Sequence, residues 1–147
     1  KIKSDKFKRS TFIKEVADNW EYDIKIILQF NTLRETQMED IVTSKVEVKN
    51  LPDYLGYTRE EFKKYILNWS DSPIFSKDEI AKLHTISEEK RLSAIKHEID
   101  SYVVSNHVRY FKKDGGFVWT IYRAHYDLNQ STCVTKLKLL TENTLIE

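Results

Sequence analysis

The sequence predicts an α+β domain in which helices cover one face of an antiparallel sheet. Two observations carry this prediction. Apolar and polar residues alternate with a period of two early in the chain and again in its last third, and helix-start signals occur between these regions. The 147 residues are 40% hydrophobic and 12% aromatic, which is enough for one packed core.

The first 20 residues are basic at their start and then helical. Ile13, Val16 and Trp20 follow the spacing of one helix face, which predicts an amphipathic cap helix over 1–20 ahead of a main domain over 21–147. These three residues are our candidates for a dimer or cap interface. Because the chain starts without Met, we expect it to be a piece of a longer protein.

The clearest strand follows this segment. Its apolar residues alternate with polar ones over nine positions, broken only by Ile27, as expected for a half-buried strand. They are Tyr22, Ile24, Ile26, Leu28 and Phe30. A second short strand is expected near 41–43.

Three Ser/Thr-x-x-Glu signatures predict three helix starts in the middle of the chain. They begin at Thr58, Ser76 and Thr85. We therefore expect short helices over 58–67 and 77–83, and a longer helix over 87–100.

The last third is rich in Val, Tyr, Phe, Trp and Thr, and predicts a meander of three strands over 102–112, 116–127 and 131–141. Asp114-Gly115 is a two-residue hairpin signal, for which a type I′ turn is expected.

Three segments, in this order, resemble the sequence signatures of PAS domains. Leu55-Gly56-Tyr57-Thr58-Arg59-Glu60-Glu61-Phe62 is similar to the L-G-Y-[ST]-x-E-E-[LF] segment. The run from Arg109 to Trp119, with Lys113-Asp114-Gly115 inside it, is similar to the R-x-x-x-K-D-G-x-x-x-W hairpin. Leu139-Leu140-Thr141-Glu142-Asn143-Thr144 is similar to the D-I-T-E-x close of the last strand, although the leading Asp is missing. Together they span about residues 20–145.

The resemblance implies a five-stranded antiparallel sheet in the order 2-1-5-4-3, with helices closing one face over a cavity. It also implies a sensory or dimerisation module for signal transduction. Histidine kinases of two-component systems, diguanylate cyclases and transcription regulators carry such modules. The expected partners are a second copy of the chain, an output domain in the same longer protein, and a small-molecule ligand.

Composition and charge exclude several function classes. The 24 Lys and Arg balance 23 Asp and Glu, so no nucleic-acid binding is expected of this domain. Three glycines cannot form a dinucleotide or P-loop motif. The single cysteine, Cys133, excludes an internal disulfide and a cysteine-based zinc site, and fits a reducing, cytoplasmic setting. We expect no metal site.

Arg109 and Arg123, on neighbouring predicted strands, are the candidate ligand-binding cations, because a cavity-mouth arginine needs a carboxylate or an anionic ligand. Trp119, Tyr122 and His107 are the candidate residues around them. The alternative for the arginines is an ion pair with Glu or Asp on the sheet surface. Apolar residues occur on both faces of these strands, so the sheet is expected to be buried on both sides.

The cofactor is left open. In haem-binding PAS domains a histidine of the long helix is the axial ligand, and His97 lies on the corresponding predicted helix. Leu92, Ile95 and Ile99 share one face of that helix and His97 points away from it, which argues against haem. Covalent flavin photochemistry is not expected, because Cys133 lies in the last predicted strand rather than on a central helix.

No pair of ionisable groups is positioned for acid–base work, so this domain is not expected to be an enzyme, whatever output activity the full-length protein carries. The alternative to a ligand sensor is a protein-interaction module whose core is filled by its own aromatic side chains.

Overall fold

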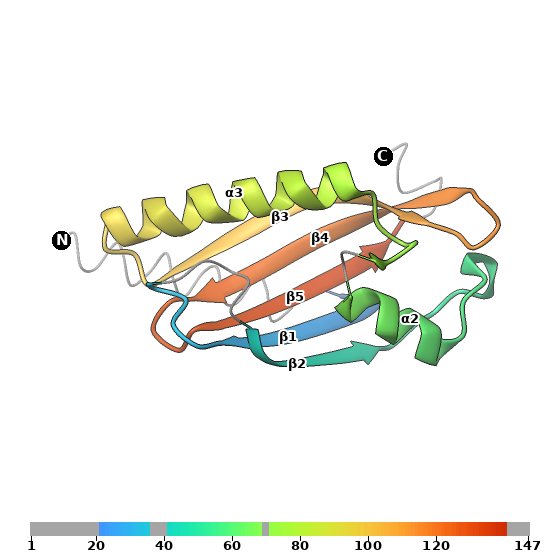
Figure 1. The fold of residues 1–147 in the computed structure, drawn as a ribbon, viewed down its shortest axis with the longest axis horizontal. Helices are drawn as coiled ribbons and strands as arrows, with labels where there is room; N and C mark the ends of the chain where they lie inside the picture. Colours follow the sequence, from blue (N-terminus) through green and yellow to red (C-terminus); the bar gives the residue numbers. More distant parts are fainter. Residues whose placement is uncertain (1–20, 36–40, 69–70, 141–147) are drawn as a thin grey trace.

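A computed structural model describes residues 21–35, 41–68 and 71–140 (Figure 1). The predicted cap helix, with Ile13, Val16 and Trp20, lies outside the described residues. The same holds for the third PAS-like segment from Thr141 onward.

Five strands form one antiparallel sheet in the order β2-β1-β5-β4-β3. Their bounds are Ile24–Phe30 (β1), Ile41–Val48 (β2), Ser101–Phe111 (β3), Phe117–Asp127 (β4) and Thr132–Leu139 (β5). This confirms the α+β prediction and the strand order implied by the resemblance. The alternation in β1 and the β-rich last third were therefore reliable signals, whereas β2 is longer than predicted.

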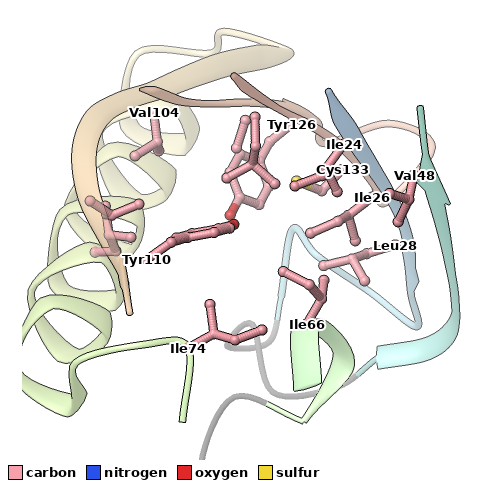
Figure 2. Close-up of a cluster of buried hydrophobic side chains, with 14 of the residues drawn as sticks. Ile24, Ile26, Leu28, Val48, Ile66, Ile74, Val104, Tyr110, Tyr126 and Cys133 are labelled. Carbon is pink, nitrogen blue, oxygen red and sulfur yellow. The ribbon is translucent and has the colours of Figure 1, made fainter. Parts of the chain in front are cut away.

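The inner face of the sheet is built from alternate residues of each strand. Ile24, Ile26, Leu28 and Phe30 of β1 are all at most 6% exposed, and the intervening residues of that strand are more exposed. In β3 and β4 the even-numbered side chains face inward. The sheet curves around this core, so that β3 and β2 lie on opposite sides of the buried cluster (Figure 2).

Two helices close the inner face. Helix α2 (Arg59–Leu67) lies by the end of β2, where the Arg59 guanidinium donates to the Val48 carbonyl. Helix α3 (Lys77–Lys96) runs alongside β3 (Figure 1). A short 3-10 helix, η1 (Asp53–Leu55), precedes α2.

The outer edge of β3 is covered by α3 and the segment before it. The Phe111 N–H donates to the Ile74 carbonyl at 2.8 Å, and the Lys90 ammonium donates to the Val103 carbonyl at 2.8 Å. Glu79 accepts from the Arg109 N–H at 3.2 Å. These bonds satisfy backbone groups that an edge strand otherwise leaves open to strand pairing.

The prediction of two helices over 77–83 and 87–100 was wrong, because α3 is continuous. Thr85 does not cap a new helix. Its hydroxyl donates to the Ala81 carbonyl at 3.1 Å, which is how threonine fits inside a helix. The helix ends before Glu98, whose φ of 57° cannot continue it.

The prediction of a type I′ turn was also wrong, although the hairpin between β3 and β4 is present. Gly115 has a φ of 104°, but Asp114 is not among the residues with positive φ. The Gly115 N–H donates to the Lys112 carbonyl at 3.1 Å, and the Lys112 N–H donates to the Gly116 carbonyl at 2.6 Å. This is a longer loop in which a turn is followed by one left-handed glycine.

Candidate functional site

A cavity of about 50 Å³ lies between the inner face of the sheet and α3. Its apolar wall comes mainly from β1, β3 and β5, with Phe75 from the segment before α3. The wall residues from these strands are Ile26, Leu28, Phe30, Val108 and Leu137. The position between the central helix and the sheet is the one at which the resemblance implies a cavity.

Helix α3 lines the cavity with one continuous face. Ile80, Leu83, His84 and Ser87 all border it, at the i, i+3, i+4, i+7 spacing of a helix face. Sequence reasoning missed this face, because the predicted break after residue 83 divided it between two helices. The spacing itself was the signal that could have revealed it.

Hydroxyl groups, together with His84 of α3, form the polar part of the wall. The Ser87 and Tyr126 hydroxyls lie 3.5 Å apart, and the Thr135 hydroxyl lies 3.4 Å from the Cys133 sulfur. The Tyr110 hydroxyl is buried and has no hydrogen-bond partner. Figure 2 shows the Tyr110 ring reaching from β3 into the interior, in the space that Tyr126 also enters.

Burial keeps these groups in their neutral forms. It raises the pKa values of the Tyr110, Tyr122 and Tyr126 phenols above the ordinary tyrosine value, since a phenolate would lose its hydration there. For the same reason burial raises the pKa of the Cys133 thiol to about 12. None of the residues that border the cavity is Lys, Arg, Asp or Glu, so its wall is polar through hydroxyl groups and the His84 imidazole.

Of the five candidate ligand-binding residues, only Tyr122 borders the cavity. The other four occupy odd positions in β3 and β4, on the opposite face of the sheet, and so do not join it. They are His107, Arg109, Trp119 and Arg123. Their expected role in ligand binding stays a prediction for that outer face.

Arg109 has the carboxylate partner that the alternative reasoning named. Its guanidinium lies 3.3 Å from a Glu79 carboxylate oxygen, and 5.2 and 5.5 Å from the ring centroids of Phe111 and Phe117. Glu79 belongs to α3, so the ion pair joins the helix to the sheet edge. The outer face is only partly buried: His107 is exposed, while Trp119 is intermediate.

His97 ends α3 as its C-cap and is exposed, as expected. The prediction that Leu92 shares the apolar face of this helix was wrong, since Leu92 is 54% exposed. Ala94 is buried instead. Within 21–35, 41–68 and 71–140, no group of three or more His, Cys, Asp or Glu side chains is placed to hold a metal ion.

The first two PAS-like segments contact each other. The Lys113 N–H donates to the Leu55 carbonyl at 2.9 Å, and the Lys113 ammonium lies 3.3 Å from the Glu61 carboxylate. Gly56 has a φ of 85°, and a Cβ placed there would lie 2.9 Å from the Lys113 Cβ. A glycine is therefore needed both for the backbone conformation and for the close approach.

Thr58 makes both bonds of the predicted capping box. It accepts from the Glu61 N–H at 3.1 Å, and Glu61 accepts from the Thr58 N–H at 3.0 Å. The Ser76 signature is only half realised: Ser76 accepts from the Glu79 N–H, but the Glu79 carboxylate binds Arg109 instead.

A buried arginine ties α3 to the connection after β1. Arg91 is 5% exposed, and it donates to Glu88 and to the Leu33 and Arg34 carbonyls. This guanidinium therefore links α3 directly to the connection after β1.

No protein-family model matches this chain, and no curated protein matches it either. In the part of the chain that the structure describes, neither helix combines the length and apolar character needed to cross a membrane.

Proposed function

We propose that this chain is a PAS-type sensory and dimerisation domain of a larger signalling protein in the cytoplasm. In this proposal a small molecule binds in the cavity, and the change is passed to an output domain such as a histidine kinase, a diguanylate cyclase or a transcription regulator. The domain performs no catalysis itself.

The observation that carries the proposal is the sheet order β2-β1-β5-β4-β3, together with a cavity under the central helix. The contact between Gly56 and Lys113 adds to it, because it joins two segments on which the resemblance depends. Segments about 60 residues apart that pack on each other explain why both signatures occur in one chain.

The arrangement provides a route for a signal. A ligand in the cavity touches α3 and the sheet together, so its binding favours some packings of the helix over others. The Arg91 and Arg109 contacts then carry a helix shift to the connection after β1 and to the edge of β3. A few kcal/mol of differential binding is sufficient to shift such an equilibrium.

A ligand-free interaction module is the second candidate, and the aromatic core favours it. The Tyr102 and Tyr126 rings stack at 4.7 Å, and Phe75 packs edge-on against Tyr110 at 5.2 Å. In this alternative the side chains themselves fill the interior, and the signal is the docking of a partner.

Native mass spectrometry of the purified chain distinguishes the two candidates. Extra mass that disappears on denaturation supports a ligand sensor, and an absorption band in the same sample identifies haem or flavin. If the native mass equals the mass of the chain alone, and no ligand is extracted from protein freshly purified from the cell lysate, the result contradicts the ligand sensor and supports the interaction module.

The expected homodimer has its own test. Substitution of Ile13 and Val16 by Asp places charges on the predicted cap-helix face, and is expected to convert a dimer into a monomer in a solution mass measurement. An unchanged dimer contradicts this interface.

A further inference from the structure

The two edges of the sheet differ in how they are covered. On the β3 side, α3 and the segment before it bond backbone groups of the strand, as at Phe111 and Val103. The opposite edge is β2, which stands first in the strand order β2-β1-β5-β4-β3 (Figure 1). Six of its eight residues are exposed, and no described strand pairs with it on the side away from β1. It is therefore the open edge of the described sheet.

The hydrogen bonds to β1 show which backbone groups of β2 point outward. The Lys49 N–H donates to the Asp23 carbonyl at 2.7 Å, and in an antiparallel ladder every second facing pair bonds in this way. The residues of β2 at even positions therefore turn their N–H and carbonyl groups away from β1. Among them, the carbonyl of Val48 accepts from a guanidinium of α2. The outward groups of Ser44 and Val46 are the ones that a further strand can bind.

The side chains of β2 have a charge pattern that complements itself. Lys45 and Glu47 flank Val46. When two copies of β2 run antiparallel about a two-fold axis at Val46, each Lys45 lies opposite the Glu47 of the other copy. An axis at Lys45 would place two lysines opposite each other, and an axis at Ser44 would place Lys45 opposite Thr43. Opposite charges at facing positions stabilise paired strands, whereas like charges destabilise them, so the charges favour the axis at Val46.

Both charged side chains are available for this contact. Lys45 and Glu47 are exposed, and neither makes an ion pair with a described residue. Within the sheet, Lys45 lies opposite Ile27 of β1, so a second copy gives it a facing carboxylate. Val46 is half-buried and packs against the core. Pairing about this residue therefore also brings two apolar side chains together.

We propose that the open edge of β2 is a self-association surface, which pairs antiparallel with β2 of a second copy of this chain about a two-fold axis at Val46. The two sheets then continue into each other, and a Lys45–Glu47 pair lies on either side of the axis. The occupant is a second copy and not an extended segment of unrelated sequence, because the charge order is its own complement. This contact is separate from the cavity and from the predicted cap-helix interface, so it goes beyond the proposed function.

The experiment measures the association constant of the full chain by sedimentation equilibrium in charge-reversed variants. Lys45→Glu and Glu47→Lys each place like charges opposite each other twice, and each is expected to weaken association roughly tenfold. An equimolar mixture of the two variants places opposite charges at every facing position, so its association is expected to recover. Lys82→Glu is the matched control, because Lys82 is an exposed residue of α3 and the change in charge is the same. The cap-helix segment is identical in all variants, so the differences between them report on β2.

Amide hydrogen exchange tests the pairing on the unsubstituted chain, and so remains decisive if a variant fails to fold. The Val46 N–H is bonded only in the pair, whereas the Lys45 N–H is bonded to β1 with or without a second copy. Exchange at Val46 is therefore expected to slow as the protein concentration rises, while exchange at Lys45 stays the same.

Three results overturn this inference. They are a Val46 exchange rate that does not depend on concentration, an equal loss of association in Lys82→Glu, and a mixture that associates no more tightly than the single variants. A chain that stays monomeric at every concentration also overturns it, and leaves the edge to a partner of different sequence. None of these results contradicts the ligand sensor, which native mass spectrometry tests separately.

Discussion

Substitution of Glu88 by Gln is expected to destabilise the fold, because it removes the negative charge beside a buried guanidinium. The Arg91 side chain is 6% exposed and gives two N–H groups to the Glu88 oxygens, at 3.0 and 2.6 Å. Loss of one partner from a buried ion pair costs about 3–5 kcal/mol. Since the Glu88 side chain is 27% exposed, water screens part of this pair, and we expect a loss of about 2–3 kcal/mol.

The assay is urea denaturation followed by circular dichroism, with the free energy of unfolding taken by linear extrapolation. The same loss corresponds to a fall in Tm of about 4–12 °C for a chain of this size. Glu89→Gln is the control, because the neighbouring Glu89 is exposed. A loss below about 0.5 kcal/mol in Glu88→Gln, within the range of ordinary surface substitutions, refutes the reasoning, as does an equal loss in the control.

A double variant tests the pairing itself. Arg91→Met also destabilises, since it leaves the Leu33 and Arg34 carbonyls without their donor. The combined Glu88→Gln and Arg91→Met variant is expected to lose less than the two single losses together, by about 1–2 kcal/mol. Simple additivity shows that the two side chains are not coupled.

The remaining predictions concern backbone conformation and buried acids. Gly56→Ala is expected to lower the free energy of unfolding in urea by about 1–3 kcal/mol, because Gly56 has a positive φ and the Lys113 Cβ lies close to it. Gly116→Ala is expected to cost less, because there only the end of the Lys112 side chain must move. A larger loss in Gly116→Ala than in Gly56→Ala contradicts this account. The pKa of about 12 for Cys133 lowers its thiolate fraction at pH 8. The folded chain is therefore expected to react with a disulfide reagent roughly 1000-fold more slowly than the chain unfolded in guanidinium chloride. Similar rates for the folded and the unfolded chain contradict the burial of Cys133. Burial raises the pKa values of tyrosines such as Tyr126, so the unfolded chain loses these phenol protons at a lower pH than the folded chain. The free energy of unfolding is therefore expected to be unchanged below about pH 9 and to fall above about pH 10, by about 1.4 kcal/mol per pH unit for each such tyrosine. A urea midpoint that is the same at pH 8 and pH 11 contradicts this prediction.

The sheet could be predicted from the sequence because its signals are local. In β1 the four alternate apolar residues from Ile24 to Phe30 are buried, and Ile27, which breaks the alternation, is exposed. The Thr58 capping box needs only residues 58–61, and the structure contains both of its bonds. Such features depend on neighbours in the chain, so no knowledge of the tertiary structure is needed to find them.

The candidate site could not be predicted in the same way. In β4 both faces are apolar, so the pattern does not say whether Trp119 or Tyr122 faces the core; that is decided by which face α3 covers. The break expected near Thr85 had a similar cause, since its hydroxyl satisfies either a helix start or the Ala81 carbonyl of a continuing helix. The Glu79–Arg109 pair spans 30 residues and carries no sequence signal at all.

The division of the cavity wall between α3 and the sheet has a consequence for how this domain can diversify. The sheet side is fixed by inter-strand hydrogen bonds, whose register any insertion would disturb. The α3 side consists of Ile80, Leu83, His84 and Ser87 on one helix face, where substitutions alter shape and polarity but leave the helical backbone bonds intact. Exchanging these four residues is therefore the shortest route, for evolution or for an engineer, to a new molecular preference on an unchanged scaffold.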